Sequence, residues 1–288
     1  MRMRHAVLFA ALPAVLALAA CGSDDDGATS TTVPPADTQP TGAGGFDYAT
    51  GPDDVVLQVS QEGGFVPAGF VFTATPMLSI TGDGHVFTPG VMTMQYPGPL
   101  VAPTSVQTIT PEGIEAVLAL AAEHELLATP PVYPRNDMVA DAPDTVVTLT
   151  VGGETFEHRA YALGIVPDDG TESDPARANL AAFVEQVVDL SAVVPEGSLS
   201  APEPFVAAAY EIQAMPADAS NVEGASEVAW ASDSGISLAA ATECASVPDT
   251  DVAATALLLG GTQATFFTED GVTYQVFARP HLPGGPAC

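Results

Sequence analysis

The sequence contains no lysine. Its 6 cations are all arginine and stand against 36 Asp and Glu residues, which gives a formal net charge of −30 at pH 7. The missing lysine excludes phosphate-binding loops and kinases that require that side chain, and it excludes enzymes that require an amine for a Schiff base or for Ser-x-x-Lys acylation. The shortage of positive charge excludes nucleic acid as a partner, because so negative a field repels phosphate.

Histidine is also sparse, and its pattern carries no recognisable site. Beyond the N-terminal region it occurs at His85, His124, His158 and His281, with no pair at zinc-ligand spacing and no Gly-x-Ser-x-Gly motif in the chain. We therefore expect no catalytic residue that the sequence can name, no metal site and no cofactor. A hydrolase assembled from distant residues is an open alternative.

The acidic residues permit two interpretations. A strongly negative surface attracts cationic peptides or basic protein patches, but acidity is also a compositional habit of high-GC or salt-adapted bacteria. Two carboxylate-rich loops, around Asp137 to Asp144 and Asp168 to Asp174, offer oxygen atoms to calcium. Neither loop has EF-hand spacing, so we predict that both are solvated.

The N-terminal region has the pattern of an export signal. Arg2 and Arg4 precede an apolar run over Ala6 to Ala20, which is too short for a permanent transmembrane helix. The run ends in Leu18-Ala19-Ala20-Cys21, which resembles the lipobox of bacterial lipoproteins. The resemblance implies removal of residues 1–20, diacylation of Cys21 and anchoring to the outer face of the bacterial cell membrane; the alternative is an ordinary signal peptide with a chance cysteine.

Cysteine is the next scarce residue. With Cys21 assigned to lipid, Cys244 and Cys288 remain, an even number suited to an oxidising compartment. We predict a disulfide that ties residue 288 back into the fold, and a catalytic Cys244 is the alternative.

Composition divides the mature chain into four parts. Residues 21–52, rich in Gly, Ser, Thr and Asp, are predicted to be a disordered tether, and residues 193–204 a linker. Residues 53–192 and 205–288 carry the apolar patterns of folded domains.

The pattern over 53–192 predicts an α+β domain. Expected strands include Val55 to Ser60, Phe70–Phe72, Met77–Ile80, Val91 to Tyr96 and a hairpin over Val147 to Tyr161. Helices are expected after Thr110 and Asp174, which have N-cap chemistry and are each followed by proline. We predict a mainly antiparallel sheet with both helices packed on one face.

Residues 205–288 predict a smaller α+β module. Strands are expected over Phe205 to Met215 and Glu227 to Ala231, and a helix over Asp249 to Leu259. A hairpin with an Asp-Gly turn is expected over Thr265 to Ala278.

Two aromatic residues beside glycine and proline are candidate ligand contacts. Phe65 follows Gly63-Gly64, and Tyr96 begins Tyr96-Pro97-Gly98-Pro99-Leu100. As candidates they would contribute to an apolar surface for a peptide or small ligand; the competing interpretation, which we slightly prefer, is that each packs under its own loop.

A second resemblance concerns the order of elements. Leu57-Gln58-Val59 through Gly63-Gly64-Phe65, then Ile114–Leu127, Asp144–Tyr161 and Leu180–Leu190, resembles the plan of emfourin-type inhibitors of thermolysin-like metalloproteases. The whole chain resembles acidic lipoproteins of high-GC bacteria. Our interpretation is a lipid-anchored, non-enzymatic binding or structural module at the cell surface, with a metalloprotease inhibitor as the alternative; the sequence gives no oligomeric state.

Overall fold

The structure is a computed structural model that describes residues 45–67, 69–135, 139–165, 174–285 and 288. All of these residues belong to one compact unit, which spans Gln39–Cys288. The unit has an α+β fold with two sheets that are mainly antiparallel. The predicted fold class is therefore confirmed.

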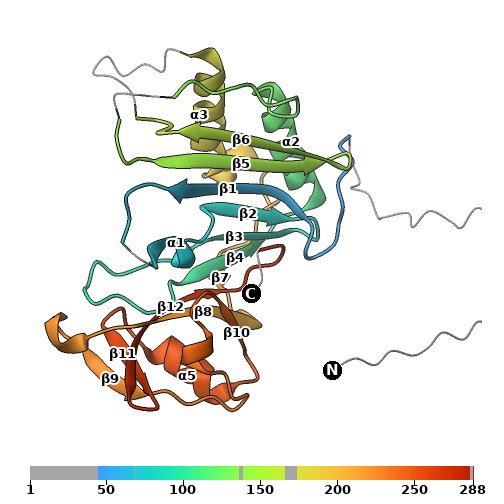
Figure 1. Ribbon diagram of the computed structural model, residues 1–288. Coiled ribbons are helices and arrows are strands. Elements are labelled where there is room, and N and C mark those ends of the chain that lie inside the picture. The colour runs from blue at the N-terminus through green and yellow to red at the C-terminus, as the bar shows by residue number, and fades with distance from the viewer. Residues whose placement is uncertain (1–44, 68, 136–138, 166–173, 286–287) are drawn as a thin grey trace, which may run out of the picture. The chain divides into compact units, whose positions relative to one another are not determined.

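The first sheet has seven strands in the order β6-β5-β1-β2-β3-β4-β7 within the described ranges (Figure 1). Its strands are β1 (Val55–Gly63), β2 (Leu78–Thr81), β3 (His85–Pro89), β4 (Thr104–Thr108), β5 (Pro143–Val151), β6 (Glu154–Tyr161) and β7 (Glu203–Pro204). Every neighbouring pair is antiparallel.

Helices α2 (Pro111–Glu123) and α3 (Pro175–Val187) begin as predicted. The Thr110 side chain accepts a hydrogen bond from the Gly113 N–H, and the Asp174 carboxylate accepts one from the Arg177 N–H. Each cap satisfies an N–H that the first helical turn leaves unpaired, and the proline after it needs no partner.

Both helices cover one face of the first sheet (Figure 1). Their apolar stripes join the alternate inward residues of the central strands in one core, which the short helix α4 (Leu190–Val193) extends. Fully buried members include Leu57, Val59, Leu118, Leu149 and Phe183. The predicted packing on a single face is confirmed.

The second sheet has the order β10-β8-β12-β11-β9. Its strands are β8 (Ala209–Pro216), β9 (Ser226–Ala229), β10 (Ala245–Pro248), β11 (Thr265–Glu269) and β12 (Val272–Pro280), accompanied by the 3-10 turns Ala219–Asn221 and Leu238–Ala240. The β11–β12 hairpin turns at Asp270-Gly271, which both have positive φ, as its sequence predicts. β9 pairs with β11 in parallel, the exception to the antiparallel pattern.

Helix α5 (Val252–Gly260) begins at a buried carboxylate. Asp251 accepts hydrogen bonds from the Ala254 N–H at 3.1 Å and the Asp233 N–H at 2.9 Å. It also accepts one from the Ser232 hydroxyl and one from the Ser234 N–H. Burial raises the pKa of Asp251, but these hydrogen bonds outweigh burial and hold that pKa well below its ordinary value. The side chain thus joins the 232–234 loop to the helix.

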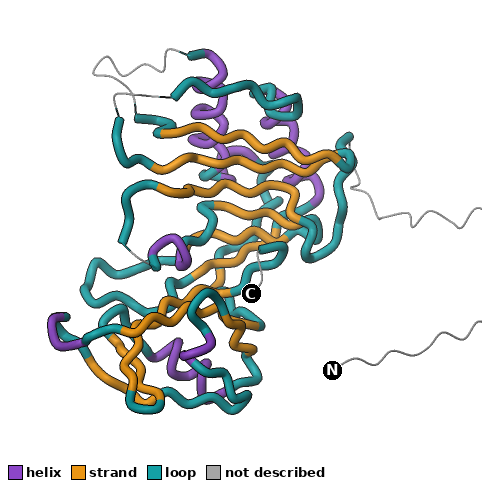
Figure 2. Tube along the Cα trace, viewed as in Figure 1, coloured by secondary structure: helices purple, strands orange, loops and turns teal. Residues whose placement is uncertain are grey.

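Two predicted strands are wrong. Phe70–Phe72 lies in the short helix α1 (Phe70–Thr73), and Val91 to Tyr96 lies in the loop between β3 and β4 (Figure 2). Both stretches are apolar, but neither has a neighbouring strand to pair with; helix α1 packs on β12 instead. The β-propensity of these residues is therefore not sufficient to form a strand without a neighbouring strand to pair with.

The structure also places two sequence boundaries differently. Tyr48, expected in the tether, is buried in the first core, and the Gly45 N–H donates to the Glu115 carboxylate at 2.9 Å. Strand β7, expected in the linker, pairs with β4. Within the part of the chain that the structure describes, no helix combines the length and apolar character needed to cross a membrane.

Candidate ligand-binding cleft

A cleft of about 450 Å³ lies between the end of β1 and the end of β12. A third wall is formed by residues between β1 and β2, namely Val66, Phe70 and Val71 of α1, and residues 74–76. Apolar side chains line much of it: Val66, Phe70, Val71, Ala74, Pro76, Pro280 and Leu282. The polar lining comes mainly from β1, with Gln58, Ser60, Gln61 and Glu62, and from Glu211 and Arg279.

The cleft exists because the chain leaves the first sheet after β1 and packs on the second sheet before returning as β2. Gly69, with φ 78°, lies against the Phe277 ring of β12, where an added Cβ would come within 2.4 Å of ring carbons. Glycine therefore permits both the left-handed turn and the close approach. The Phe72 ring then lies 4.9 Å from the Arg279 guanidinium carbon.

Two apolar side chains of the cleft are unusually exposed. Phe70 is 56% exposed and Val71 is 61% exposed. Large apolar side chains grouped at a concave surface are characteristic of ligand sites. A ligand that covers them would gain hydrophobic stabilisation that folding alone does not supply.

The cleft lining includes an ion pair between the buried Glu211 and the partly exposed Arg279. Glu211 is 1% exposed, and one of its oxygens accepts bonds from the Arg279 Nε at 2.7 Å and Nη2 at 2.6 Å. Its other oxygen lies 3.0 Å from the His281 Nδ1. Glu211 thus contacts both Arg279 and His281, and these contacts join the ends of β8 and β12.

The two predicted ligand contacts are exposed but do not line this cleft. Phe65 is 86% exposed, beside the cleft residue Val66, and Tyr96 is 65% exposed in the β3–β4 loop. The sequence-based prediction missed Phe70, Val71, Glu211 and Arg279. A signal for one of them was present, since Glu211 interrupts the apolar run around Tyr210 and Ile212 and thereby predicts a buried charge with a partner.

The predicted disulfide pair is joined in the structure. Cys244 and Cys288 are bonded, with a Cα–Cα distance of 5.3 Å. Within the described ranges these sulfurs and a Glu211 oxygen lie within 4.8 Å of one another, but bonded sulfurs cannot act as thiolate ligands. Cys21 lies outside the described residues.

A second cavity, of about 500 Å³, lies beside α2 and includes Leu126 and Tyr133 in its lining. The same two residues contact the buried His158. Its Nε2 lies 2.9 Å from the Leu126 carbonyl oxygen, and its Nδ1 lies 2.6 Å from the Tyr133 hydroxyl. The carbonyl can only accept, so Nε2 carries the proton and Nδ1 accepts from Tyr133. Burial lowers the pKa of His158, and burial followed by the nearby charge of Asp174 raises the pKa of Tyr133 to about 12.

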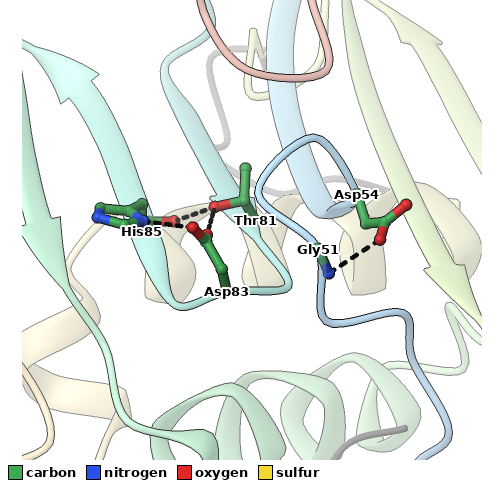
Figure 3. Close-up of polar contacts among 5 residues, drawn as sticks. All are labelled: Gly51, Asp54, Thr81, Asp83 and His85. Atoms are coloured by element: carbon green, nitrogen blue, oxygen red, sulfur yellow. Dashed lines mark hydrogen bonds and ion pairs between the residues drawn. The ribbon is translucent and has the colours of Figure 1, made fainter. Parts of the chain in front are cut away.

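The turn between β2 and β3 brings a hydroxyl, a carboxylate and an imidazole together (Figure 3). The Thr81 hydroxyl donates to Asp83 at 2.6 Å, and the His85 Nδ1 lies 2.9 Å from the other Asp83 oxygen. Thr81 is fully buried and bonds the carboxylate rather than the imidazole. The arrangement lacks the hydroxyl-to-imidazole bond of a catalytic triad and instead stabilises the turn.

Comparison of the chain with protein-family models, with curated proteins and with solved structures finds no significant match.

Proposed function

We propose that the protein is a lipid-anchored binding module on the outer face of the bacterial cell membrane, and that its ligand occupies the cleft between β1 and β12. The observation that carries this proposal is the pair of exposed side chains Phe70 and Val71 in a concave site of about 450 Å³. That volume lies within the range of about 300 to 1,000 Å³ typical of ligand sites. No catalytic step is part of the proposal.

The proposed anchor rests on the sequence. Leu18-Ala19-Ala20-Cys21 supplies the lipidation motif, and two acyl chains on Cys21 hold a protein stably on a membrane. The variant Cys21→Ala is expected to release the protein from the membrane fraction. Unchanged membrane association would overturn the anchor without bearing on the cleft.

The cleft is tested with Nile red, an uncharged apolar dye whose fluorescence rises in apolar sites. We expect saturable binding to the purified protein, weakened about tenfold by Val71→Asp, because a carboxylate in the cleft removes apolar contact area. The matched control is Val132→Asp, since Val132 is 94% exposed and does not line the cleft. Equal binding by all three proteins would remove the cleft as the ligand site.

A second candidate function, inhibition of a thermolysin-like metalloprotease, is favoured by the β3–β4 loop. Val91 is 96% exposed and Met94 fully exposed at 105%, while the Gly90 N–H bonds the Pro103 carbonyl oxygen at 2.7 Å at the loop base. An exposed apolar loop on a fixed base suits insertion into a protease cleft. The test is a thermolysin assay, in which inhibition should fall with Met94→Asp; no inhibition at high protein concentration would exclude this function.

A further inference from the structure

We infer that the ligand of the cleft is an extended peptide segment of another protein, which pairs with the free edge of β1 at Gln61 and places apolar side chains against Phe70 and Val71. The inference rests on the proposed function, because it specifies the ligand class of the same cleft. Its basis is the main-chain geometry of β1.

Strand β1 extends further than its neighbour β2. On one side, β5 pairs with β1 from Leu57 to Gly63, the full length of the cleft wall. On the other side, β2 pairs with β1 no further than Val59, whose carbonyl accepts a bond from the Met77 N–H at 2.8 Å. The residues of β1 after Val59 therefore have a neighbouring strand on one side only.

Strand geometry identifies the residue with free main-chain groups. Successive residues direct their N–H and C=O to opposite sides of a strand, and Val59 directs its carbonyl toward β2. Gln61, two residues later, directs its own groups to the same side, beyond the end of β2. Among the described residues, no strand pairing and no main-chain hydrogen bond reaches Gln61 from that side. Gln61 is exposed and lines the cleft, so it presents a donor and an acceptor to an added strand.

The cleft can also receive the side chains of such a strand. Leu57 and Val59 point into the core, so Gln58, Ser60 and Glu62 point to the opposite face, where they line the cleft. An added strand directs every second side chain to that same face. Those side chains meet the apolar wall formed by Phe70, Val71 and Leu282.

Charge indicates which peptides and which partners fit. At the rim, Arg159 contacts the carboxylates of Glu62 at 2.7 Å, Asp144 at 3.6 Å and Glu157 at 3.4 Å, so negative charge exceeds positive charge there. This excess, within a chain of net charge −30, favours a peptide that carries Lys or Arg. The same net charge opposes a second copy of this chain as the occupant.

The test starts from a random heptapeptide library displayed on phage and selected on the purified full-length protein. Enriched peptides should alternate apolar residues with other residues and should carry Lys or Arg. The enriched peptides are then synthesised and their affinity is measured. The variant Gln61→Pro removes the free N–H without removing a bond to β5, and it should lower that affinity about tenfold. The comparison variant Gln61→Ala keeps that N–H and should weaken peptide binding clearly less than Gln61→Pro does.

A second measurement leaves the protein unaltered. N-methylation of the peptide amide that pairs with Gln61 should abolish binding, whereas N-methylation of the next amide along should be tolerated, because only alternate amides face β1. Full binding by both methylated peptides would overturn strand addition. So would equal weakening by Gln61→Pro and Gln61→Ala, or enrichment of acidic peptides.

The remaining outcomes separate this inference from the proposed function. Peptides that lose binding to Val71→Asp but keep it with Gln61→Pro overturn strand addition and leave the cleft as a ligand site. Failure to enrich any peptide overturns the inference, and the Nile red titration then decides the proposed function by itself. A dimer in sedimentation that Gln61→Pro dissociates would identify a second copy as the occupant and would also overturn the inference.

Discussion

The buried Glu211 carboxylate and the partly exposed Arg279 guanidinium form an ion pair across β8 and β12, with two Arg279 nitrogens 2.7 Å and 2.6 Å from one carboxylate oxygen. Removing the cation leaves the buried carboxylate with the His281 imidazole as its remaining side-chain partner in the described structure. We expect Arg279→Met to lower the free energy of unfolding by about 3 to 5 kcal/mol in urea titrations.

The matched control for that variant is Arg159→Met. Its guanidinium side chain is 41% exposed and contacts exposed carboxylates, so the loss should stay under about 1 kcal/mol. Equal losses for the two variants would contradict the structural role assigned to Glu211 and Arg279.

The disulfide provides a second prediction. Cys244 and Cys288 are 44 residues apart in the sequence, and the chain-entropy relation for such a loop gives about 4 kcal/mol of stabilisation. The double variant Cys244→Ala/Cys288→Ala should lose about that amount. Nile red binding should weaken as well, because Pro280, Leu282 and Gly285 form part of the cleft wall. Unchanged dye binding would show that this wall keeps its structure without the disulfide.

Asp251 is expected to stabilise the second sheet region strongly. Asp251→Ala removes a helix cap and the bonds to the 232–234 loop, at an expected cost of about 3 kcal/mol. The matched control is Asp218→Ala, which removes an exposed cap of a single 3-10 turn and should cost much less than Asp251→Ala. Because the folded-state pKa of Asp251 is lowered, its stabilisation is present above the unfolded pKa of about 4 and is lost as the pH falls further.

Because the pKa of His158 is lowered in the folded protein, we expect the stability of the protein to change at mildly acidic pH. The folded-state pKa of His158 lies below the ordinary value of 6.5, because burial opposes the charged form. The unfolded chain therefore binds the proton first, so stability is complete above about pH 6.5 and falls as the pH drops below it. Unfolding midpoints between pH 7 and 5 should show this slope, and His158→Gln should remove it; an identical slope in the variant would assign it to another group.

Capping residues and apolar spacing were sufficient to predict the helices that cover the first sheet. Thr110 and Asp174 are N-caps, and their helices pack on one face of the sheet as the apolar spacing predicts. The β11–β12 hairpin likewise follows from its Asp-Gly turn. These features depend on residues close together in the sequence.

The cleft depends on long-range pairing, and the sequence did not reveal it. Phe70–Phe72 has the composition of a strand, but Gly69 brings this stretch against Phe277, about two hundred residues away in the chain, where it forms a helix. Phe65 was predicted because it follows two glycines, yet the cleft is lined by its neighbour Val66 and by Phe70 and Val71. β1 is longer than β2, and the free edge that this leaves is set by the pairing of β1 with β2 and β5, which the sequence alone does not show.

Strand β7 makes the two sheets poor candidates for independent exchange during evolution. Glu203 and Pro204 complete the edge of the first sheet beside β4, and the same segment leads directly into Phe205, whose ring lies 5.0 Å from that of Phe87 in β3. Pro99 and Val101, just before β4, form bridges to residues of the second sheet region. A gene that ended the first domain at residue 192 would leave β4 as an uncovered edge open to aggregation. Recombination at this apparent linker would therefore damage both parts, and the two sheets are expected to be inherited together.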